Sequence, residues 1–284
     1  MTIAYLIQVH KCAKQIKTLI NCLLANDKNH CFIHVDKKSV DVYKELQNFY
    51  RNHSRVSIIN ECYRVNWSGF SQVKASLSLM KSVYQHATNF DRIQLMSGED
   101  FPVKSLEYID LFMYKNKDKE FIEFEDMGKY SWRILQYNFF TEFCYNRNLV
   151  IRIVQRTLRE LQKLLSPRNI FESMCLYKGA SWFNLSIEAM DYILHYIDNN
   201  PQYIKQFYKT ACADEHFFQM ILLNSNFKDK IINSNLYYTQ WQEDQSSPMY
   251  LDIKGIAFAK SNDSILFARK INEYMAEELS KDCK

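Results

Sequence analysis

The first 125 residues alternate between short apolar runs and longer stretches with helical periodicity. Ile3 to Val9 and Cys31 to Val35 are apolar runs of strand length, and between them Ala13 to Leu24 has apolar residues at helical spacing. Val56 to Ile59 and Asp91 to Met96 are typical of two further strands. This alternation predicts an α/β fold, with a Rossmann-like, doubly wound open sheet and flanking helices.

Asp36 follows the second predicted strand directly. In an open parallel sheet this position lies at the carboxyl edge, where ligands bind, and a carboxylate there can accept hydrogen bonds from a ribose or a base. Asp36 can equally cap a helix predicted over Val40 to Tyr50, and the sequence leaves both interpretations open. A last strand is predicted over Glu120 to Glu125, where charged and apolar side chains alternate.

The chain contains only five Gly and four Pro and has no low-complexity tract. This composition predicts a single domain over residues 1–284. The net charge of +4 is too small for a dedicated nucleic-acid-binding protein, so we expect no nucleic-acid partner. No run approaches the roughly 20 apolar residues of a membrane-spanning helix.

Eight cysteines are dispersed along the chain without a CxxC motif. Together with the lack of a signal-peptide pattern, this favours reduced thiols in the cytoplasm over disulfides or a zinc site. Leu149 to Leu165 is a basic amphipathic helix by its spacing. Such a helix can lie on a membrane or a partner, which allows a peripheral contact with the inner face of the membrane, but we favour a simply solvated face.

Asp214 and Glu215 precede an apolar run in which Phe217, Met220 and Ile221 have helical spacing. The pattern predicts that Asp214 caps this helix or lies in its first turn. Glu215 would then stand at the positive end of the helix dipole, which stabilises the ionised carboxylate that a general base requires. Simple helix capping by both acids is the alternative.

Six short strings occur in an order that resembles one enzyme family. They are His34-Val35-Asp36-Lys37-Lys38-Ser39, Val65-Asn66-Trp67-Ser68-Gly69-Phe70-Ser71, Ser97-Gly98-Glu99-Asp100-Phe101-Pro102, Gly179-Ala180-Ser181-Trp182-Phe183, Asp214-Glu215-His216-Phe217-Phe218 and Leu266-Phe267-Ala268-Arg269-Lys270. Together they resemble the core-2/I-branching N-acetylglucosaminyltransferase and peptide O-xylosyltransferase family, in a bacterial-type form without a membrane anchor or stem.

The resemblance implies a GT-A-type glycosyltransferase fold that inverts the anomeric centre without a metal. The sequence agrees in having no Asp-x-Asp motif. A metal-free transferase must neutralise the departing diphosphate with basic side chains, and the resemblance gives this role to Lys270, with Arg269 beside it and Lys254 as the second cation. It also implies that Glu215 is the catalytic base and that His10 and Asp36 contact the nucleotide.

The resemblance implies that residues 1–125 form a nucleotide-sugar-binding half and residues 126–284 an acceptor-binding and catalytic half. The resemblance places a further set near the acceptor or donor sugar: Trp67, Ser97, Asp100, Glu123, Arg133, Ser181, Trp182 and Trp241. Glu243 stands where the vertebrate branching enzymes have an acceptor-contacting Tyr, which argues against transferring their acceptor to this chain.

The resemblance therefore implies transfer of a sugar, GlcNAc in the leading interpretation, from a UDP-sugar to a hydroxyl of a glycan or lipid-linked glycan in surface-polysaccharide synthesis. No cofactor is expected. Xylose or another sugar is the alternative donor group. A non-catalytic glycan-binding protein on the same fold is the alternative from another class.

Overall fold

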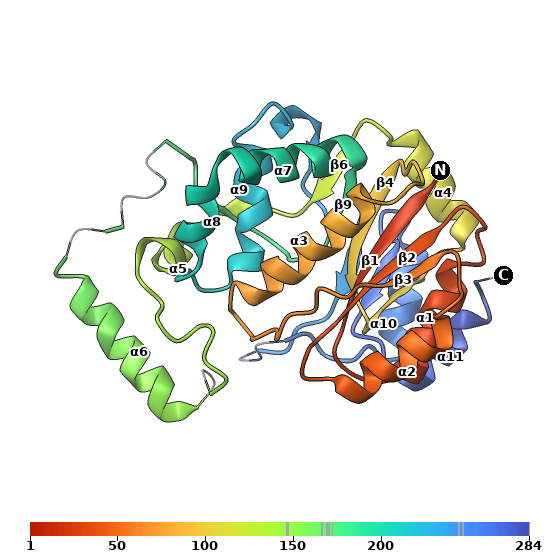
Figure 1. The fold of residues 1–284 in the computed structure, drawn as a ribbon, viewed down its shortest axis with the longest axis horizontal. Helices are drawn as coiled ribbons and strands as arrows, with labels where there is room; N and C mark the ends of the chain where they lie inside the picture. The colour runs from red at the N-terminus through yellow and green to blue at the C-terminus, as the bar shows by residue number, and fades with distance from the viewer. Residues whose placement is uncertain are drawn as a thin grey trace.

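The computed structural model describes residues 1–145, 148–165, 167–168, 171, 173–243, 245 and 247–283. Within these residues the central element is a seven-stranded sheet in the order β10-β6-β9-β4-β1-β2-β3 (Figure 1). Its strands are β1 (Ile3–Val9), β2 (His30–Val35), β3 (Val56–Ile58), β4 (Arg92–Ser97), β6 (Glu120–Ile122), β9 (Phe183–Ser186) and β10 (Ile231–Ile232). The first four strands run parallel, and β9 is antiparallel to β4 and β6. The expected α/β class and open sheet are confirmed.

Both faces of this sheet are buried by helices. On β1, Ile3, Tyr5 and Ile7 pack into one apolar cluster and Ala4 and Leu6 into the other, because successive side chains of a strand point to opposite faces. The first cluster contains residues of α1 (Ala13–Leu23), α2 (Val40–Tyr50), α4 (Leu106–Lys115), α10 (Ile253–Ser261) and α11 (Glu273–Ser280). The second contains residues of α3 (Ser71–Tyr84), α7 (Ile187–Asn199), α8 (Pro201–Phe207) and α9 (Phe217–Leu223).

The strand predicted over Glu120 to Glu125 is divided in the structure. β6 ends at Ile122, and Glu125–Asp126 forms β7, which pairs with β8 (Tyr177–Lys178) in a separate ribbon. The main chain leaves the central sheet between them, where the Phe124 amide donates to Asn233 Oδ1 at 2.8 Å. The prediction of one continuous strand is therefore wrong.

A second, three-stranded sheet brings the C-terminal part of the chain to the end of β4. It contains β5 (Asp100–Pro102), β12 (Phe267–Arg269) and β11 (Tyr237–Thr239). β12 is antiparallel to β5, and their register places Arg269 opposite Asp100. Residues near positions 100 and 269 therefore share one place in the fold.

Cys22 on α1 forms a disulfide with Cys283. α1 and α11 pack together, which brings the two Cα atoms to 5.3 Å although 261 residues separate them. The prediction that all thiols are reduced is wrong for this pair, because sequence spacing does not show which distant cysteines the fold brings together. Cys12, Cys31, Cys62, Cys144, Cys175 and Cys212 are free.

Helix α6 (Leu149–Gln162) lies at the periphery, away from both faces of the sheet (Figure 1). It confirms the helix predicted from Leu149, although it ends three residues earlier than expected. None of its residues is buried. Among the helices formed by the described residues, none is long and apolar enough to cross a membrane.

Candidate active site

The carboxyl ends of β1, β2 and β4 meet at one edge of the central sheet. The register pairs Val9 with Val35 and Gln8 with Ser97, so His10, Asp36 and Gly98 follow directly at this edge. The strand order also turns here, since β2 and β4 lie on opposite sides of β1. Such a switch point is where open α/β sheets bind nucleotides.

Asp36 is buried at this edge, and its side chain organises the loop after β2. Its Oδ1 accepts a hydrogen bond from the Lys38 amide at 2.8 Å, and Lys38 Nζ lies 3.3 Å from Oδ2. The residue that precedes α2 is Ser39, so the interpretation of Asp36 as the cap of this helix is wrong. The Ser39 hydroxyl donates to the carbonyl oxygen of the exposed His10 at 2.6 Å, which joins the two predicted nucleotide-contacting loops.

A cluster of two lysines surrounds Glu99 beside this edge. Glu99 Oε1 lies 2.8 Å from Lys11 Nζ and accepts a hydrogen bond from the Tyr250 hydroxyl at 2.5 Å. Lys270 Nζ lies 3.6 Å from the other oxygen. Burial opposes ionisation of Glu99, but the Lys11 and Tyr250 hydrogen bonds and the charge of Lys270 lower its pKa to about 2. Two cations thus share one carboxylate, which leaves positive charge for an incoming anion.

Sequence reasoning named Lys270 but missed Lys11, Glu99 and Tyr250 as part of this cluster. The position of Lys11, directly after His10, could have revealed it. Lys254 is exposed on the first turn of α10, and the nearby Leu251 amide donates to the carbonyl oxygen of Lys270 at 2.9 Å. Lys254 therefore lies three residues after Leu251, whose amide is bound to Lys270. The structure describes no contact between the side chains of Lys254 and Lys270.

Ser97, Asp100, Arg269 and Trp182 form a second cluster. Asp100 is fully buried and accepts hydrogen bonds from the Ser97 amide at 2.7 Å and from the Ser97 hydroxyl at 2.8 Å. Arg269 Nη1 binds Asp100 Oδ1 at 2.6 Å, and its guanidinium lies 4.9 Å from the ring centre of Trp182. Burial raises the pKa of Asp100, whereas Arg269 opposes this shift. Much of the charge of Arg269 is therefore used to neutralise Asp100.

Asp214 and Glu215 lie in a 3-10 turn, η2 (Ala213–Glu215), and α9 begins only at Phe217. The prediction that Asp214 caps the helix is wrong, because its Oδ2 instead accepts a hydrogen bond from the Ser181 hydroxyl at 2.5 Å. Burial, and then the negative charge of Glu215, raise the pKa of Asp214 to about 6. Ser181 adjoins Trp182, so this turn is continuous with the Arg269 cluster.

The Glu215 carboxylate forms an ion pair with Arg133, which lies on the short helix α5 (Trp132–Leu135). One third of the Glu215 side chain remains exposed, against 17% of Arg133. Arg133 lies over the ring of Tyr130, in the 3-10 turn η1 (Gly128–Tyr130), at 4.7 Å. The pair fixes the carboxylate while leaving it accessible.

Glu123 lies close enough to Glu215 for the two charges to interact. Burial, followed by the charges of Glu125 and Glu215, raises the pKa of Glu123, and its Oε2 accepts a hydrogen bond from Asn235 at 2.9 Å. Gly179 joins these two acids, since its amide donates to the Glu215 carbonyl oxygen at 2.8 Å. A Cβ at this glycine would lie 1.7 Å from the Glu123 carbonyl oxygen, so the backbone approach requires glycine.

Trp67 and Trp241 lie on loops and expose 50% and 58% of their surfaces. Ser68, next to Trp67, accepts a hydrogen bond at its carbonyl oxygen from the Cys212 amide at 2.9 Å, so the Trp67 loop touches the turn that carries Glu215. Trp241 lies two residues after the end of β11 at Thr239. Their roles in sugar binding stay predictions.

No group of three or more His, Cys, Asp or Glu side chains is arranged to hold a metal ion within the part of the chain that the structure describes. Metal independence stays a prediction.

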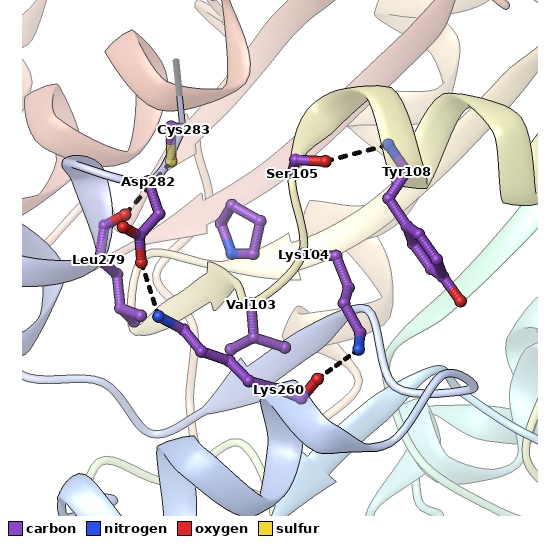
Figure 2. Close-up of a pocket in the computed structure, with 9 residues that line it drawn as sticks. Val103, Lys104, Ser105, Tyr108, Lys260, Leu279, Asp282 and Cys283 are labelled. Atoms are coloured by element: carbon purple, nitrogen blue, oxygen red, sulfur yellow. Dashed lines mark hydrogen bonds and ion pairs between the residues drawn. The ribbon is translucent and has the colours of Figure 1, made fainter.

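A separate pocket of about 320 Å³ lies among β5, α4, α10 and the end of α11, and it is lined by Cys283 of the disulfide but by none of the candidate-site residues (Figure 2). Lys104 donates to the carbonyl oxygen of Lys260, whose own Nζ lies 2.6 Å from Asp282. The ammonium groups of Lys104 and Lys260 are therefore held by other residues of the pocket lining, and we assign this pocket no role.

The site residues thus form a continuous series along the carboxyl edge of an open α/β sheet, from Asp36 through the lysines to the Arg133–Glu215 pair. An accessible carboxylate beside the carboxyl edge of an open α/β sheet has the features of a ligand-binding site. The sequence model of the Core-2/I-Branching enzyme family matches residues 3–261. The chain belongs to this family, as the resemblance implied, and its architecture agrees with the expected GT-A type.

Curated relatives include xylosyltransferases from mammals. The chain is 25% identical over 242 residues to xylosyltransferase 2 of Rattus norvegicus, which covers 84% of this chain and 26% of the rat protein. Its identity to xylosyltransferase 1 of Rattus norvegicus is 23%, over an alignment that covers 84% of this chain and 28% of the rat protein. The chain thus spans about a quarter of the length of these relatives. Core-mannan synthase A of Aspergillus fumigatus superposes over 81% of this chain and 72% of its own, with 11% identity and a TM-score of 0.37.

Proposed function

We propose that this protein is an inverting, metal-independent glycosyltransferase that moves a sugar from a UDP-sugar to a hydroxyl group of a glycan. The observation that carries the proposal is the accessible Glu215 carboxylate, fixed by Arg133 at one end of a series of site residues whose other end is a pair of lysines at the nucleotide edge. A base and a charge-neutralising cluster are the two elements that this reaction requires.

In this mechanism the acceptor hydroxyl attacks the anomeric carbon from the face opposite the diphosphate. Glu215 takes the hydroxyl proton as the new C–O bond forms, and the bond from the anomeric carbon to the diphosphate oxygen breaks. Arg133 holds Oε2 of Glu215, so Oε1 is the oxygen that receives the proton. Asp214 is bound to Ser181 and supports the turn instead of taking part in proton transfer.

The departing diphosphate leaves with both bonding electrons and needs neutralisation without a metal. Lys270 and Lys11 supply it, because they share the single charge of Glu99 and can move toward the ligand. Lys254 is a third cation from the neighbouring α10. Arg269 acts mainly by neutralising Asp100 and by placing Trp182, which with Ser181, Glu123, Trp67 and Trp241 forms the sugar-binding wall.

GlcNAc is our leading donor sugar and xylose the alternative. The names of the curated relatives favour xylose, whereas the family description includes branching enzymes. The acceptor is a glycan or a lipid-linked glycan of surface polysaccharide. We place the reaction in the cytoplasm; the Cys22–Cys283 disulfide is the observation against it, since disulfides persist in oxidising compartments. Counting free thiols in protein trapped directly from cells tests this: eight free thiols fit the reducing cytoplasm, whereas six show that the disulfide forms there.

The test is release of UDP from UDP-GlcNAc, UDP-xylose and other UDP-sugars, after a thermal-shift screen that identifies the donor by its stabilisation of the folded state. Transfer that persists in EDTA supports the mechanism, and strict dependence on an added divalent cation overturns it. Glycan binding without release of UDP from any donor would instead establish the non-catalytic alternative.

A further inference from the structure

Helix α6 turns a mixed side toward the body of the protein, and its half-buried residues are Ile151, Gln155, Leu158, Arg159 and Gln162. The Tyr137 amide donates to Gln162 Oε1 at 2.6 Å, and Gln155 Nε2 donates to the Tyr137 carbonyl oxygen at 3.2 Å. The Arg159 guanidinium lies 4.0 Å from the ring centre of Trp132. Two glutamines and one stacked arginine supply the polar contacts of this helix, and Ile151 and Leu158 are the only apolar residues of the helix that are half-buried, where a surface helix ordinarily buries most of its apolar side.

Most of the apolar residues of α6 face solvent. Five helical residues on one arc of the 3.6-residue periodicity, together with two leucines that follow the helix, have between 40% and 84% of their surface exposed: Leu149, Val150, Ile153, Val154, Leu161, Leu164 and Leu165. The sequence favoured a simply solvated face for this helix and did not indicate that its apolar residues would be the exposed ones. By the same spacing, Thr157 and Glu160 also fall within this arc. A largely apolar exposed surface of this kind marks an interaction site.

Positive charge borders the apolar arc on one edge. Arg152, Arg156 and Lys163 are exposed and fall on the same side by helical spacing. Between residues 149 and 163 the only acid is Glu160, which lies 2.7 Å from Lys163, against four basic residues. Leucine, isoleucine and valine beside a basic edge form the pattern of a helix that lies in the interface of an anionic bilayer.

We propose that α6 docks this protein on a membrane surface that contains anionic phospholipid. The apolar arc enters the headgroup boundary, and Arg152, Arg156 and Lys163 contact the lipid phosphates. Charge complementarity favours this occupant over a second copy of the chain, because an antiparallel pair of α6 helices joined by their apolar arcs brings two basic edges together.

The docked helix is directly connected to the candidate active site. Arg159 of α6 stacks on Trp132, and the next residue along the chain is Arg133, which holds Glu215. Docking would therefore present the site close to the bilayer, where a lipid-linked acceptor resides. This consequence rests on the proposed function, whereas lipid binding itself does not.

Co-sedimentation with vesicles tests the proposal. We expect the full chain to bind vesicles of about 30 mol% phosphatidylglycerol in phosphatidylcholine at least roughly tenfold more tightly than pure phosphatidylcholine vesicles. The variant Ile153→Glu/Leu161→Glu should lose at least about tenfold in affinity. Arg152→Gln/Arg156→Gln/Lys163→Gln should lose the preference for phosphatidylglycerol and its salt sensitivity.

The matched control is Leu111→Glu, which changes a side chain of similar exposure, 51%, on α4. It should bind like the parent protein. Equal binding of the parent protein to both vesicle types, or unchanged binding of Ile153→Glu/Leu161→Glu, overturns the proposal. Self-association that this double variant abolishes, without vesicle binding by the parent protein, assigns the helix to a second copy and also overturns it. Circular dichroism and UDP binding show that each variant is folded, and they separate failure of docking from failure of the proposed enzyme activity.

Discussion

Arg133 and Glu215 form an ion pair although 82 residues separate them in the sequence. The arginine comes from a short helix beyond the central sheet, and the glutamate from the turn before α9. Arg133 is the more buried partner, so the pair sets the position of a carboxylate that ligands can still reach. Charge-assisted hydrogen bonds of this kind fix side-chain geometry closely.

Replacing Glu215 by Gln keeps the size of the side chain and removes the base. Under the proposed mechanism, we expect kcat to fall by roughly 10²- to 10⁴-fold, with UDP affinity nearly unchanged because the diphosphate binds at the lysines. Steady-state UDP release and calorimetric UDP titration measure the two effects. Glu188→Gln on α7 is the control, since this side chain is 79% exposed. Full activity of Glu215→Gln would exclude it as the base.

Lys11→Met and Lys270→Met each remove one cation from the Glu99 cluster. We expect each change to weaken UDP binding by roughly tenfold and to reduce its dependence on salt concentration, because one charge contact with the diphosphate is lost. Lys14→Met is the matched control, since Lys14 is bound at the surface to Glu273 and Glu277. Calorimetric UDP titrations of each variant at two salt concentrations measure both effects. If all three variants bind UDP like the parent protein, the diphosphate lies elsewhere.

Gly179→Ala should destabilise the fold, because the new Cβ would lie 1.7 Å from a main-chain oxygen that cannot move aside easily. We expect the free energy of unfolding to fall by at least about 2 kcal/mol in urea titrations. Gly255→Ala, in α10, is the control, since its nearest contact would be Leu251 Cδ2 at 3.3 Å, and its effect should stay within about 1 kcal/mol. Equal stability of the two variants would contradict the close approach.

Asp214→Asn tests the raised pKa of this buried carboxyl. As pH rises from about 4 to 6, the unfolded state releases its proton while the folded state, with a pKa of about 6, retains it. The parent protein should therefore lose up to about 3 kcal/mol of stability across this window. The Asn variant can still accept the Ser181 hydrogen bond and should lack this loss. Urea unfolding of the parent protein and the Asn variant at several pH values compares their free energies of unfolding. If both change in parallel with pH, the raised pKa of Asp214 is refuted.

The parts of the fold with local signals were predictable. The run Ile3 to Val9 is almost entirely apolar because β1 is buried on both faces. That pattern identifies a central strand without any knowledge of its neighbours. The division of Glu120 to Glu125 depends instead on Asn233 and Gly179, which lie far away in the sequence. Local alternation could not show it.

The candidate site follows the same rule. Placement of Asp36 and His10 at the sheet edge follows from strand order alone. The partner of Asp214 is Ser181, and the disulfide joins Cys22 to Cys283, so both depend on tertiary packing that spacing does not encode. For α6 the periodicity gave the helix, but only the contacts of Gln155 and Gln162 revealed which side faces the protein.

The pairing of β12 with β5 has a consequence for synthesis of the protein. Arg269 neutralises the buried Asp100, and Lys270 completes the cation cluster around Glu99, so residues about 170 positions apart build the site at which we propose the diphosphate binds. A ribosome-bound chain that ends before residue 270 lacks this pairing. Under the proposed function, the complete cation cluster around Glu99 therefore forms only after translation has passed β12.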